Sequence, residues 1–300
     1  MRRKAWIWGF ERVFIPRRLD KFLRDATDDS TLKGRDSIRA GRVHVNGVVC
    51  RDATKLVFEE DVVTREGDPL APRTSHVHIM LNKPLGVTSS VRDPDGRADL
   101  GQFLARMPHG VFPIGRLDRM TSGLLLFSTD GDLANAVLHP DHHTQKLYWL
   151  WLNEHVADDD PRLAVLTRGL DIRGRSVRVD SVQIVHRSED FTELHVRLSE
   201  GKNRQIRRMT RALNFYLHAL HRKAVGPLEL GALGVGEFRS LSPNEVQALW
   251  QATGGRDHVY ARKCAALRRW AQLRRQAGQP ELRLEAWLAS AEKRSSRSAR

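Results

Sequence analysis

The pattern of apolar and polar positions is helical at the start of the chain and then becomes strand-like. Apolar residues recur at helical spacing over residues 17–27, which predicts an amphipathic helix. A second short helix is predicted over residues 36–40. Two valine-rich runs, 43–45 and 48–49, then flank Asn46–Gly47, a dipeptide typical of a two-residue hairpin turn. This part of the chain is therefore expected to form two helices followed by a β-hairpin.

Longer apolar runs predict the strands of a second, larger domain. Leu124–Phe127 is wholly apolar and lies close to glycines on both sides, which favours a strand buried on both faces. Lys146–Leu152 is apolar on both alternating faces and predicts a central strand. Residues 77–82 and 191–198 are also strand-like. Asp132 is the predicted N-cap of a helix that follows the Leu124–Phe127 strand.

Composition points to a globular protein with a polyanionic partner. The chain has 300 residues, 40% of them hydrophobic, which is enough for one large domain or two modest ones. Its net charge of +14 indicates nucleic acid as the simplest partner, with a membrane surface as the competing explanation. No apolar run approaches the roughly 20 residues that cross a bilayer, so no membrane span is expected. Of the two explanations for the charge, nucleic acid is the expected one, and no membrane partner is predicted.

Cysteine usage and the N-terminus predict a cytoplasmic protein. Cys50 and Cys264 are far apart in the sequence, so neither a disulfide framework nor a zinc site is predicted. The basic segment 1–14 has only a brief apolar stretch, interrupted by charged residues, and does not resemble a signal peptide. The histidines between residues 139 and 143 lack nearby cysteines or a carboxylate cluster, so no metal site is expected there.

The first candidate for chemistry is Asp118, which stands between two arginines just before the buried strand predicted at Leu124–Phe127. An irregular segment beside a rigid core strand is a suitable place to hold one carboxylate, and the cationic setting favours its ionised form. A structural turn or ion pair with Arg116 is the plainer alternative, because structural ion pairs are commoner than catalytic ones.

The second candidate is the segment Glu200–Met209, with the sequence EGKNRQIRRM. Asn203 is a suitable N-cap, and a helix that starts there would carry a basic stripe. The stripe consists of Arg204, Arg207, Arg208 and Arg211. Apolar residues on another face would pack on the core, and a solvated basic face is the alternative interpretation.

Four segments together resemble one family. Residues 115–131 match GRLD-x-x-(T/S)-x-GLLL-x-(T/S)-x-DG, which resembles the catalytic motif of the pseudouridine synthases that modify ribosomal RNA. LNKP-x-G at 81–86, Lys-x-Tyr at 146–148 and EG-x-x-x-Q-I-R-R-M at 200–209 are similar to further motifs of that family, in the same order. The resemblance covers about residues 17–250.

The resemblance implies three catalytic residues and no cofactor or metal. Asp118 corresponds to the catalytic aspartate of the family. Tyr148 corresponds to the tyrosine that reaches the target base, and Arg207 to the arginine that pairs with the aspartate. The implied reaction turns a uridine of ribosomal RNA into pseudouridine, with the target nucleotide flipped out of its stack.

Residues 17–68 also resemble the αL RNA-binding module, which occurs at the N-terminus of several of these synthases. Contacts of such a module are expected mainly with phosphates and RNA shape. The residues predicted to bind RNA in this module and around the active site are Arg18, Lys21, Arg24, Arg35, Arg39, Arg42, Lys83, Arg116, Arg119, Lys146, Arg204 and Arg208.

The expected fold is α+β, in which an αL module precedes a catalytic domain built on a mixed, mostly antiparallel sheet with flanking helices. The predicted parts are an N-terminal extension at 1–16, the αL module at 17–72, the catalytic domain at 76–250 and a basic tail at 251–300. The tail is expected to be helical and then disordered. It is either a solvated extension or a contact with ribosomal RNA, and the sequence does not favour one over the other. Its last eight residues, KRSSRSAR, are of low complexity.

The substrate is expected to be ribosomal RNA or an assembling ribosomal subunit, and the protein a monomer. DPLAP before LNKP, the spacing from DHH to Lys-x-Tyr and the segment ALHRK resemble the small-subunit branch of the family, whereas EGKNRQIRRM resembles the large-subunit branch. A catalytically inactive assembly factor is an alternative. A glycosidase is a third, although such enzymes usually need a second carboxylate that the sequence does not offer.

Overall fold

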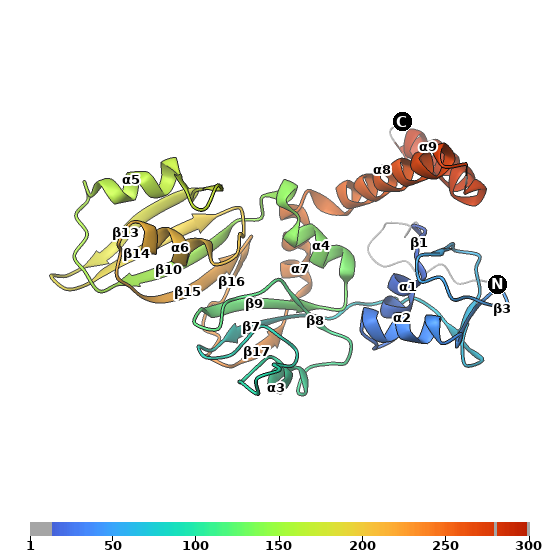
Figure 1. Cartoon of the computed structure of the whole chain (residues 1–300), viewed down its shortest axis with the longest axis horizontal. Helices are drawn as coiled ribbons and strands as arrows, with labels where there is room; N and C mark the ends of the chain where they lie inside the picture. The colour runs from blue at the N-terminus through green and yellow to red at the C-terminus, as the bar shows by residue number, and fades with distance from the viewer. Residues whose placement is uncertain (1–13, 279–280, 299–300) are drawn as a thin grey trace. The chain divides into compact units, whose positions relative to one another are not determined.

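The computed structural model describes residues 14–278 and 281–298 (Figure 1). Of the predicted N-terminal extension, residues 1–13 lie outside the described residues. The chain forms two compact units. One combines the N-terminal segment, as far as Thr74, with the C-terminal segment from Arg256, and the other spans Ser75–Gly255.

The N-terminal segment of the first unit contains the two predicted helices and the predicted hairpin. The helices are α1 (Leu19–Ala26) and α2 (Thr31–Arg39). The strands are β1 (Arg17–Arg18), β2 (Val43–Val45), β3 (Val48–Val49), β4 (Leu56–Val57), β5 (Val63–Arg65) and β6 (Asp68–Leu70). β3, β2, β5 and β6 form an antiparallel sheet in that order, and β1 pairs with β4. α2 begins earlier than predicted because the Ser30 side chain caps it by accepting from the Lys33 N–H.

The C-terminal segment of the same unit differs from the predicted tail. It forms α8 (Gly255–Gln276) and α9 (Leu282–Ser298), so the end that was expected to be disordered is helical as far as Ser298. Phe58, which is 4% exposed, packs with Ala271, Leu284 and Leu288 of these helices. The guanidinium of Arg283 stacks on the Phe58 ring and donates to Glu60 and Asp61. Apolar contact and ion pairs therefore join the two ends of the chain.

The second unit is built on one large mixed sheet with the strand order β13-β14-β10-β15-β9-β7-β17, in which β8 also pairs with β9 and β16 with β15. Its strands are β7 (His78–Lys83), β8 (Phe112–Ile114), β9 (Ser122–Ser128), β10 (Lys146–Leu152), β13 (Ser181–Arg187), β14 (Thr192–Leu198), β15 (Leu217–Val225), β16 (Leu228–Glu229) and β17 (Phe238–Ser240). A separate pair consists of β11 (Leu170–Asp171) and β12 (Ser176–Val177). The expected mixed, mostly antiparallel sheet with helices is confirmed.

The strands β9 and β10 match the predicted core strands. Residues Leu124–Phe127 of β9 are each at most 2% exposed, and β10 lies between β14 and β15. Of the strand pairs described in this sheet, β9 with β15 is parallel and the others are antiparallel. Gly123 permits this pairing, since a Cβ at its φ of +105° would lie 2.3 Å from the Arg222 carbonyl oxygen.

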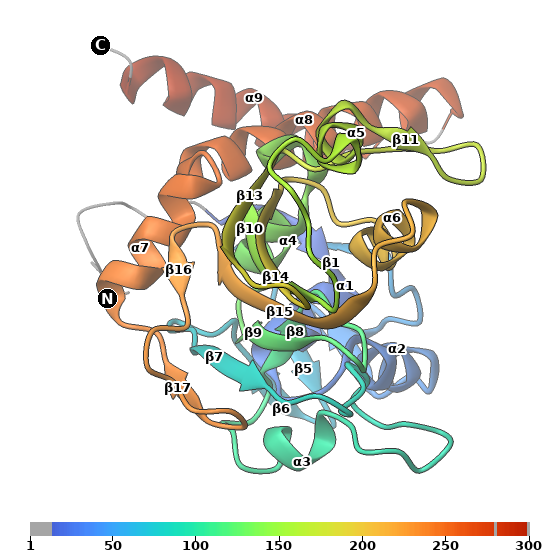
Figure 2. The same ribbon diagram turned by 90° about the vertical axis from the view of Figure 1, so that its left-hand side faces the viewer.

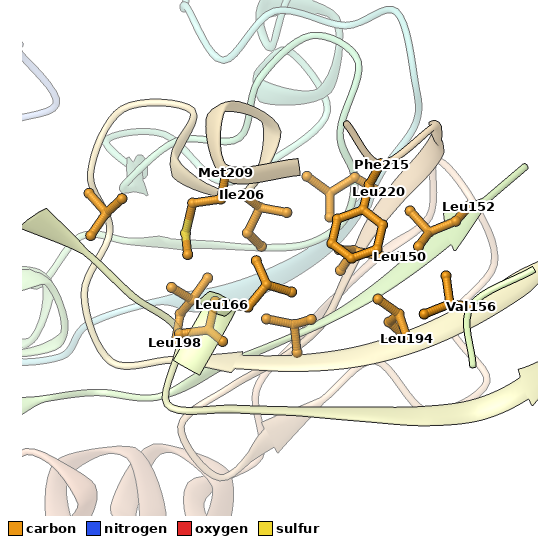
Figure 3. Close-up of a cluster of buried hydrophobic side chains, with 13 residues drawn as sticks. Leu150, Leu152, Val156, Leu166, Leu194, Leu198, Ile206, Met209, Phe215 and Leu220 are labelled. Atoms are coloured by element: carbon orange, nitrogen blue, oxygen red, sulfur yellow. The ribbon is translucent and has the colours of Figure 1, made fainter. Parts of the chain in front are cut away.

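Helices cover the sheet and place the site. α5 (Pro161–Arg168) and α6 (Gln205–Ala212) pack on one face of β10, β14 and β15 through the cluster that Figure 3 shows, with Leu166, Ile206 and Met209 facing Leu150 and Leu194. The remaining helices of this unit are α3 (Gly101–Leu104), α4 (Gly131–Leu138), the short 3₁₀ helix at Pro140–His142 and α7 (Pro243–Ala252).

One predicted cap is wrong. The N-cap of α4 is Asp130, whose carboxylate accepts from the N–H groups of Asp132 and Leu133. Asp132 lies inside the first turn, because Gly131 already has helical geometry. In the described part of the chain, no helix is both long and apolar enough to cross a bilayer.

Candidate active site

The parallel pairing of β9 and β15 places two connections at one edge of the sheet (Figure 2). Ser122 is opposite His221, and the loop with Asp118 leads into β9. The turn after α6 leads into β15. Because the strands run in the same direction, their incoming connections meet at the same edge. This is why Asp118 and Arg207, 89 positions apart in the sequence, lie close together.

The loop that carries Asp118 is held by the segment that follows β7. Leu117 is 6% exposed and belongs to the core cluster beneath this loop. Ser89 donates its hydroxyl to the Leu117 carbonyl at 2.7 Å and accepts from the Leu117 N–H at 3.0 Å. The Gly86 N–H donates to the Arg119 carbonyl at 2.8 Å. The residues on both sides of Asp118 are therefore fixed by the LNKP-x-G motif and the serine three residues after it.

The lysine of that motif, Lys83, was predicted to bind RNA, but its side chain is not accessible for such a contact. The side chain is fully buried, and its ammonium group donates to the carbonyls of Pro84 at 2.9 Å and Val87 at 2.8 Å. Burial lowers the pKa of Lys83 to about 8, the charge of Arg222 acts in the same direction, and Asp118 opposes them. Lys83 is thus an internal cation that shapes the loop rather than a surface contact.

The second motif forms a fixed turn ahead of α6. Gln205 is 6% exposed, and its amide donates to Glu200 at 2.7 Å and to the Arg178 carbonyl at 2.9 Å. The helix begins at Gln205, and the N-cap is Arg204 in a left-handed conformation rather than Asn203 as predicted. The buried glutamine tightens the turn, so Arg204 leaves the predicted helical stripe.

Asp118 lies beside two guanidinium groups. Its Oδ2 is 3.6 Å from Nη1 of Arg204 and 3.9 Å from Nε of Arg207. The carboxylate side chain is 26% exposed, Arg207 is 16% exposed and Arg204 is 50% exposed. The predicted proximity of Asp118 and Arg207 is therefore present in the structure, at ion-pair distance. Arg204 is a second cation at the same oxygen, which sequence reasoning assigned only to RNA binding.

Arg207 is anchored to the Asp118 loop by more than the carboxylate. Its Nη2 donates to the Met120 carbonyl, and Thr121 Oγ1 lies 3.4 Å from the same nitrogen. Burial lowers the pKa of Arg207 and Arg204 adds to that effect, whereas Asp118 opposes it. The buried Nε of Arg207 has no hydrogen-bond partner. This nitrogen lies 3.9 Å from Asp118 Oδ2, so a small movement of the carboxylate would bring the two within hydrogen-bond distance.

Tyr148 and Lys146 are on β10. Tyr148 is half-buried and packs against two core clusters, one below α6 and one that contains Leu117. It thus lies where the two halves of the sheet join. Lys146 is also half-buried, with Nζ 3.5 Å from the Ser199 carbonyl, and burial lowers its pKa to about 8. No hydrogen bond joins the Tyr148 hydroxyl to the Asp118 carboxylate.

The other basic residues predicted around the site are exposed. Arg116 and Arg119 flank Asp118 on the surface, and Arg208 is exposed on α6 with its guanidinium on Asn203 at 2.9 Å. A buried arginine that sequence reasoning missed is Arg222, whose Nε donates to the Leu124 carbonyl at 2.7 Å across the parallel strand pair. The sequence around Arg222, ALHRK, resembles a segment of the family, but nothing in it indicates that this arginine is buried.

In the first unit, acidic partners occupy several of the predicted RNA-binding residues. Arg18 and Arg35 both pair with the fully buried Asp20, at 2.9 and 2.8 Å. Arg24 pairs with Asp25, Arg39 with Asp36 and Arg42 with Glu66. Burial lowers the pKa of Lys21, and the nearby Arg24 adds to that effect. Positive charge is concentrated on α1, α2 and the residues next to them. It is partly accessible to solvent through the side chains of Arg18, Arg35, Arg39 and Arg42.

The candidate site is a set of charged and aromatic side chains without a cluster of metal ligands in the described residues. No group of three or more His, Cys, Asp and Glu side chains there could hold a metal ion. The arrangement offers one carboxylate, two adjacent guanidinium groups and a half-buried tyrosine. Such a set can stabilise a developing positive charge or provide one nucleophilic oxygen.

Residues 77–212 match the family model described as RNA pseudouridylate synthase. The chain is 32% identical to ribosomal large subunit pseudouridine synthase B of Bacillus subtilis, over 77% of this chain and 95% of that protein. It is also 32% identical to ribosomal small subunit pseudouridine synthase A of Escherichia coli, over 77% of this chain and 99% of that protein. A crystal structure titled pseudouridylate synthase superposes with a TM-score of 0.53 at 28% identity, and covers 77% of this chain and 99% of that one.

Proposed function

The chain belongs to the RNA pseudouridine synthase family, and from that premise we propose that it isomerises a uridine of ribosomal RNA with Asp118 as its catalytic residue. The observation that carries the assignment is the ion-pair geometry of Asp118 with Arg204 and Arg207, on a loop fixed from both sides. RNA is the partner, and no cofactor takes part in the proposed reaction.

The reaction exchanges one bond to the sugar for another. The bond from N1 of uracil to C1′ breaks, the base turns, and C5 bonds to C1′. C5 then gives up its proton and N1 takes one up, so the product is an isomer of the substrate. Breaking the first bond leaves positive charge on the sugar, and an anion beside it lowers that barrier. Asp118 supplies the anion, either as a neighbouring charge or by forming a covalent bond to the substrate through the same oxygen.

Arg207 and Arg204 position the carboxylate and favour its ionised form. Two guanidinium groups near one Oδ2 fix its direction, and the contact of Arg207 with the Met120 carbonyl ties helix α6 to the loop. Tyr148 contributes an aromatic ring and a hydroxyl next to the flipped base. In this proposal the ring stacks on uracil, or the hydroxyl accepts the C5 proton.

Residues 17–72 of the first unit are proposed to be the αL RNA-binding module. The support is the order of its elements, two helices followed by a hairpin with Asn46–Gly47 at the turn, and the positive charge around Lys21. The module would contact phosphates, so it would raise affinity for folded RNA without choosing the base.

Small-subunit RNA is the proposed substrate, since DPLAP, the DHH to Lys-x-Tyr spacing and ALHRK resemble that branch. Large-subunit RNA is a second candidate because EGKNRQIRRM resembles the other branch. Overall identity does not discriminate between them, as both named relatives are 32% identical to this chain.

The test is release of tritium from 5-tritiated uridine in small-subunit and large-subunit ribosomal RNA, as free transcripts and in subunits. Wild-type protein should release tritium from one of them, and Asp118→Asn should abolish release while RNA affinity stays within a few-fold. Tyr148→Phe keeps the ring, so a large loss would assign proton transfer to the hydroxyl. Arg207→Met should reduce turnover and stability together, since it removes the more buried cation beside Asp118.

Two results would contradict the proposal. Wild-type protein that binds ribosomal RNA but releases no tritium from any substrate would favour the inactive assembly factor. An Asp118→Asn variant as active as wild type would remove the aspartate from the mechanism. If the wild-type protein is active, mapping pseudouridines in ribosomal RNA from cells that lack it would identify the nucleotide that it modifies.

A further inference from the structure

A cavity of about 430 Å³ opens next to the Asp118 site. Its lining residues come from α6, the turn after it and the start of β15. They are Arg204, Arg207, Thr210, Arg211, Asn214, Phe215, Tyr216 and Leu217. The volume is within the range of sites that hold a nucleotide-sized ligand. Three of the lining residues are arginines and none is acidic, so the cavity favours an anion.

Two of these arginines also lie beside Asp118, so the cavity and the proposed catalytic site share two side chains. Arg204 and Arg207 each approach the Asp118 carboxylate. The third, Arg211, is exposed and lies on the same helix one turn after Arg207. Arg204 is exposed as well. A negatively charged group in the cavity would give the accessible guanidinium groups of Arg204 and Arg211 an acceptor.

Tyr216 gives the cavity an aromatic wall that is accessible to solvent. The residue is 70% exposed, which is unusual for a large aromatic side chain in a folded unit. Its backbone is nevertheless fixed, because its N–H donates to Glu154 at 2.7 Å and its carbonyl accepts from the Asn153 N–H at 2.9 Å. The ring is thus presented at a defined place without being needed by the core.

Arg162 holds the turn that presents Tyr216. Its guanidinium lies over the Phe215 ring at 4.1 Å and donates to Glu154 at 2.8 Å and to Asp160 at 2.7 Å. It also donates to the Asn214 carbonyl at 3.3 Å. Because Phe215 is itself buried in the core below α6 (Figure 3), the turn cannot move independently of the helix that carries Arg207.

We propose that this cavity binds the RNA nucleotide adjacent to the target uridine, with its phosphate on Arg211 and Arg204 and its base stacked on Tyr216. The proposal rests on the proposed function, since it takes the RNA that is bound at Asp118 as the ligand. A phosphate satisfies guanidinium groups in a bidentate manner, and stacking accepts any base. The cavity therefore fixes the strand beside the reacting nucleotide without reading its sequence.

The test is binding of a fluorescein-labelled 12-nucleotide oligouridine RNA, followed by anisotropy at several KCl concentrations. Arg211→Gln should weaken binding at least threefold and lower the salt slope by about 0.7, the value for one phosphate contact on a single strand. Tyr216→Ala should weaken binding at least fivefold with an unchanged slope, and Tyr216→Phe should bind like wild type. Arg168→Gln removes an equal charge from an exposed site on α5 that does not line the cavity, so it should bind like wild type.

Tritium release by the wild type and the same variants separates this proposal from the proposed function. Active wild-type protein whose Arg211→Gln and Tyr216→Ala variants bind and react like Arg168→Gln would overturn the cavity proposal alone. Inactive wild-type protein whose variants show the expected binding losses would overturn the proposed function and leave a nucleotide-binding cavity. Loss of binding in Tyr216→Phe as large as in Tyr216→Ala would contradict stacking.

Discussion

Ser89 and Leu117 form a reciprocal pair of hydrogen bonds, in which the serine hydroxyl donates to the leucine carbonyl at 2.7 Å and accepts from its N–H at 3.0 Å. One side chain thereby satisfies both backbone groups of the residue next to Asp118. This is the kind of supporting contact that keeps a reactive group within a fraction of an ångström of its working position.

Ser89→Ala should impair catalysis more than binding. The variant leaves the Leu117 N–H and carbonyl without their partner, which costs about 1–3 kcal/mol in the free energy of unfolding. We expect kcat to fall at least tenfold, with KM within about threefold. Ser90→Ala is the matched control, since Ser90 bonds to Thr88 and not to the Asp118 loop. Equal kcat values for the two variants would show that the Ser89 contact does not position the aspartate.

Lys83→Met should change how stability depends on pH. In wild type the pKa of Lys83 is lowered from 10.5 to about 8, so between these values the unfolded chain binds more protons than the folded one. The free energy of unfolding of wild type should therefore rise with pH across this window, relative to Lys83→Met, by about 3 kcal/mol. At pH 7 and below, where Lys83 is protonated in both states, the difference should be constant.

Urea unfolding of both proteins from pH 7 to 10.5 measures this difference, and Lys146, whose pKa is also lowered to about 8, is present in both and cancels. A difference that does not vary with pH would mean that Lys83 keeps its ordinary affinity for protons. Reduced turnover in the variant at pH 7 is also expected, because the carbonyls of Pro84 and Val87 lose the cation that holds them.

Gly123→Ala should disrupt the parallel strand pair. The new Cβ would lie 2.3 Å from the Arg222 carbonyl oxygen, and a φ of +105° is unfavourable for alanine. We expect a loss of more than about 3 kcal/mol in the free energy of unfolding. Gly174→Ala is the control, since its φ is +74° but nothing lies within 4 Å of its Cβ position, so it should lose only about 1 kcal/mol. Similar losses in chemical unfolding would show that the close approach is relieved without cost.

The sequence predicted the strands and the proximity of Asp118 and Arg207 well, for identifiable reasons. Leu124–Phe127 is apolar because both faces of its strand are buried. In Lys146–Leu152 only Leu150 and Leu152 are buried, and the other positions are half-buried in the middle of the sheet. The family resemblance supplied the pairing of Asp118 with Arg207. The apolar runs and the family motifs are both short continuous segments, so they can be recognised without knowledge of the fold.

Other features depend on contacts that no local pattern contains. A lysine at the start of a loop is a reasonable candidate for a phosphate contact. Lys83 is instead buried, and its ammonium group donates to two carbonyls of the loop that follows it. The buried Gln205 amide displaces the helix start, which puts Arg204 in a left-handed cap. Phe58 packs on α9 more than 200 residues later, so the tail could not be recognised as part of the first unit.

Removing residues 256–300 should destabilise the N-terminal module rather than leave it intact. The deletion exposes Phe58 and removes the pairs that Arg283 makes with Glu60 and Asp61. Exposure of one buried phenylalanine costs about 1.5–3 kcal/mol, which lowers the Tm of a domain of this size by roughly 10 °C. Hydrogen exchange followed by mass spectrometry should therefore be faster over residues 56–65 and unchanged over β9.

Arg283→Gln separates the two contributions to that contact. It keeps the apolar packing of Leu284 and Leu288 on Phe58 but loses the stacking of the guanidinium on that ring and both charged pairs. The pair with the exposed Glu60 contributes only about 0.2–1 kcal/mol. The side chain of Asp61 is buried, but it still accepts from the Asn46 amide and the Phe58 N–H in the variant. Exchange over residues 56–65 should then be only slightly faster than in wild type. If the truncated protein exchanges there like wild type, the module is stable by itself, and the C-terminal helices add nothing to its stability.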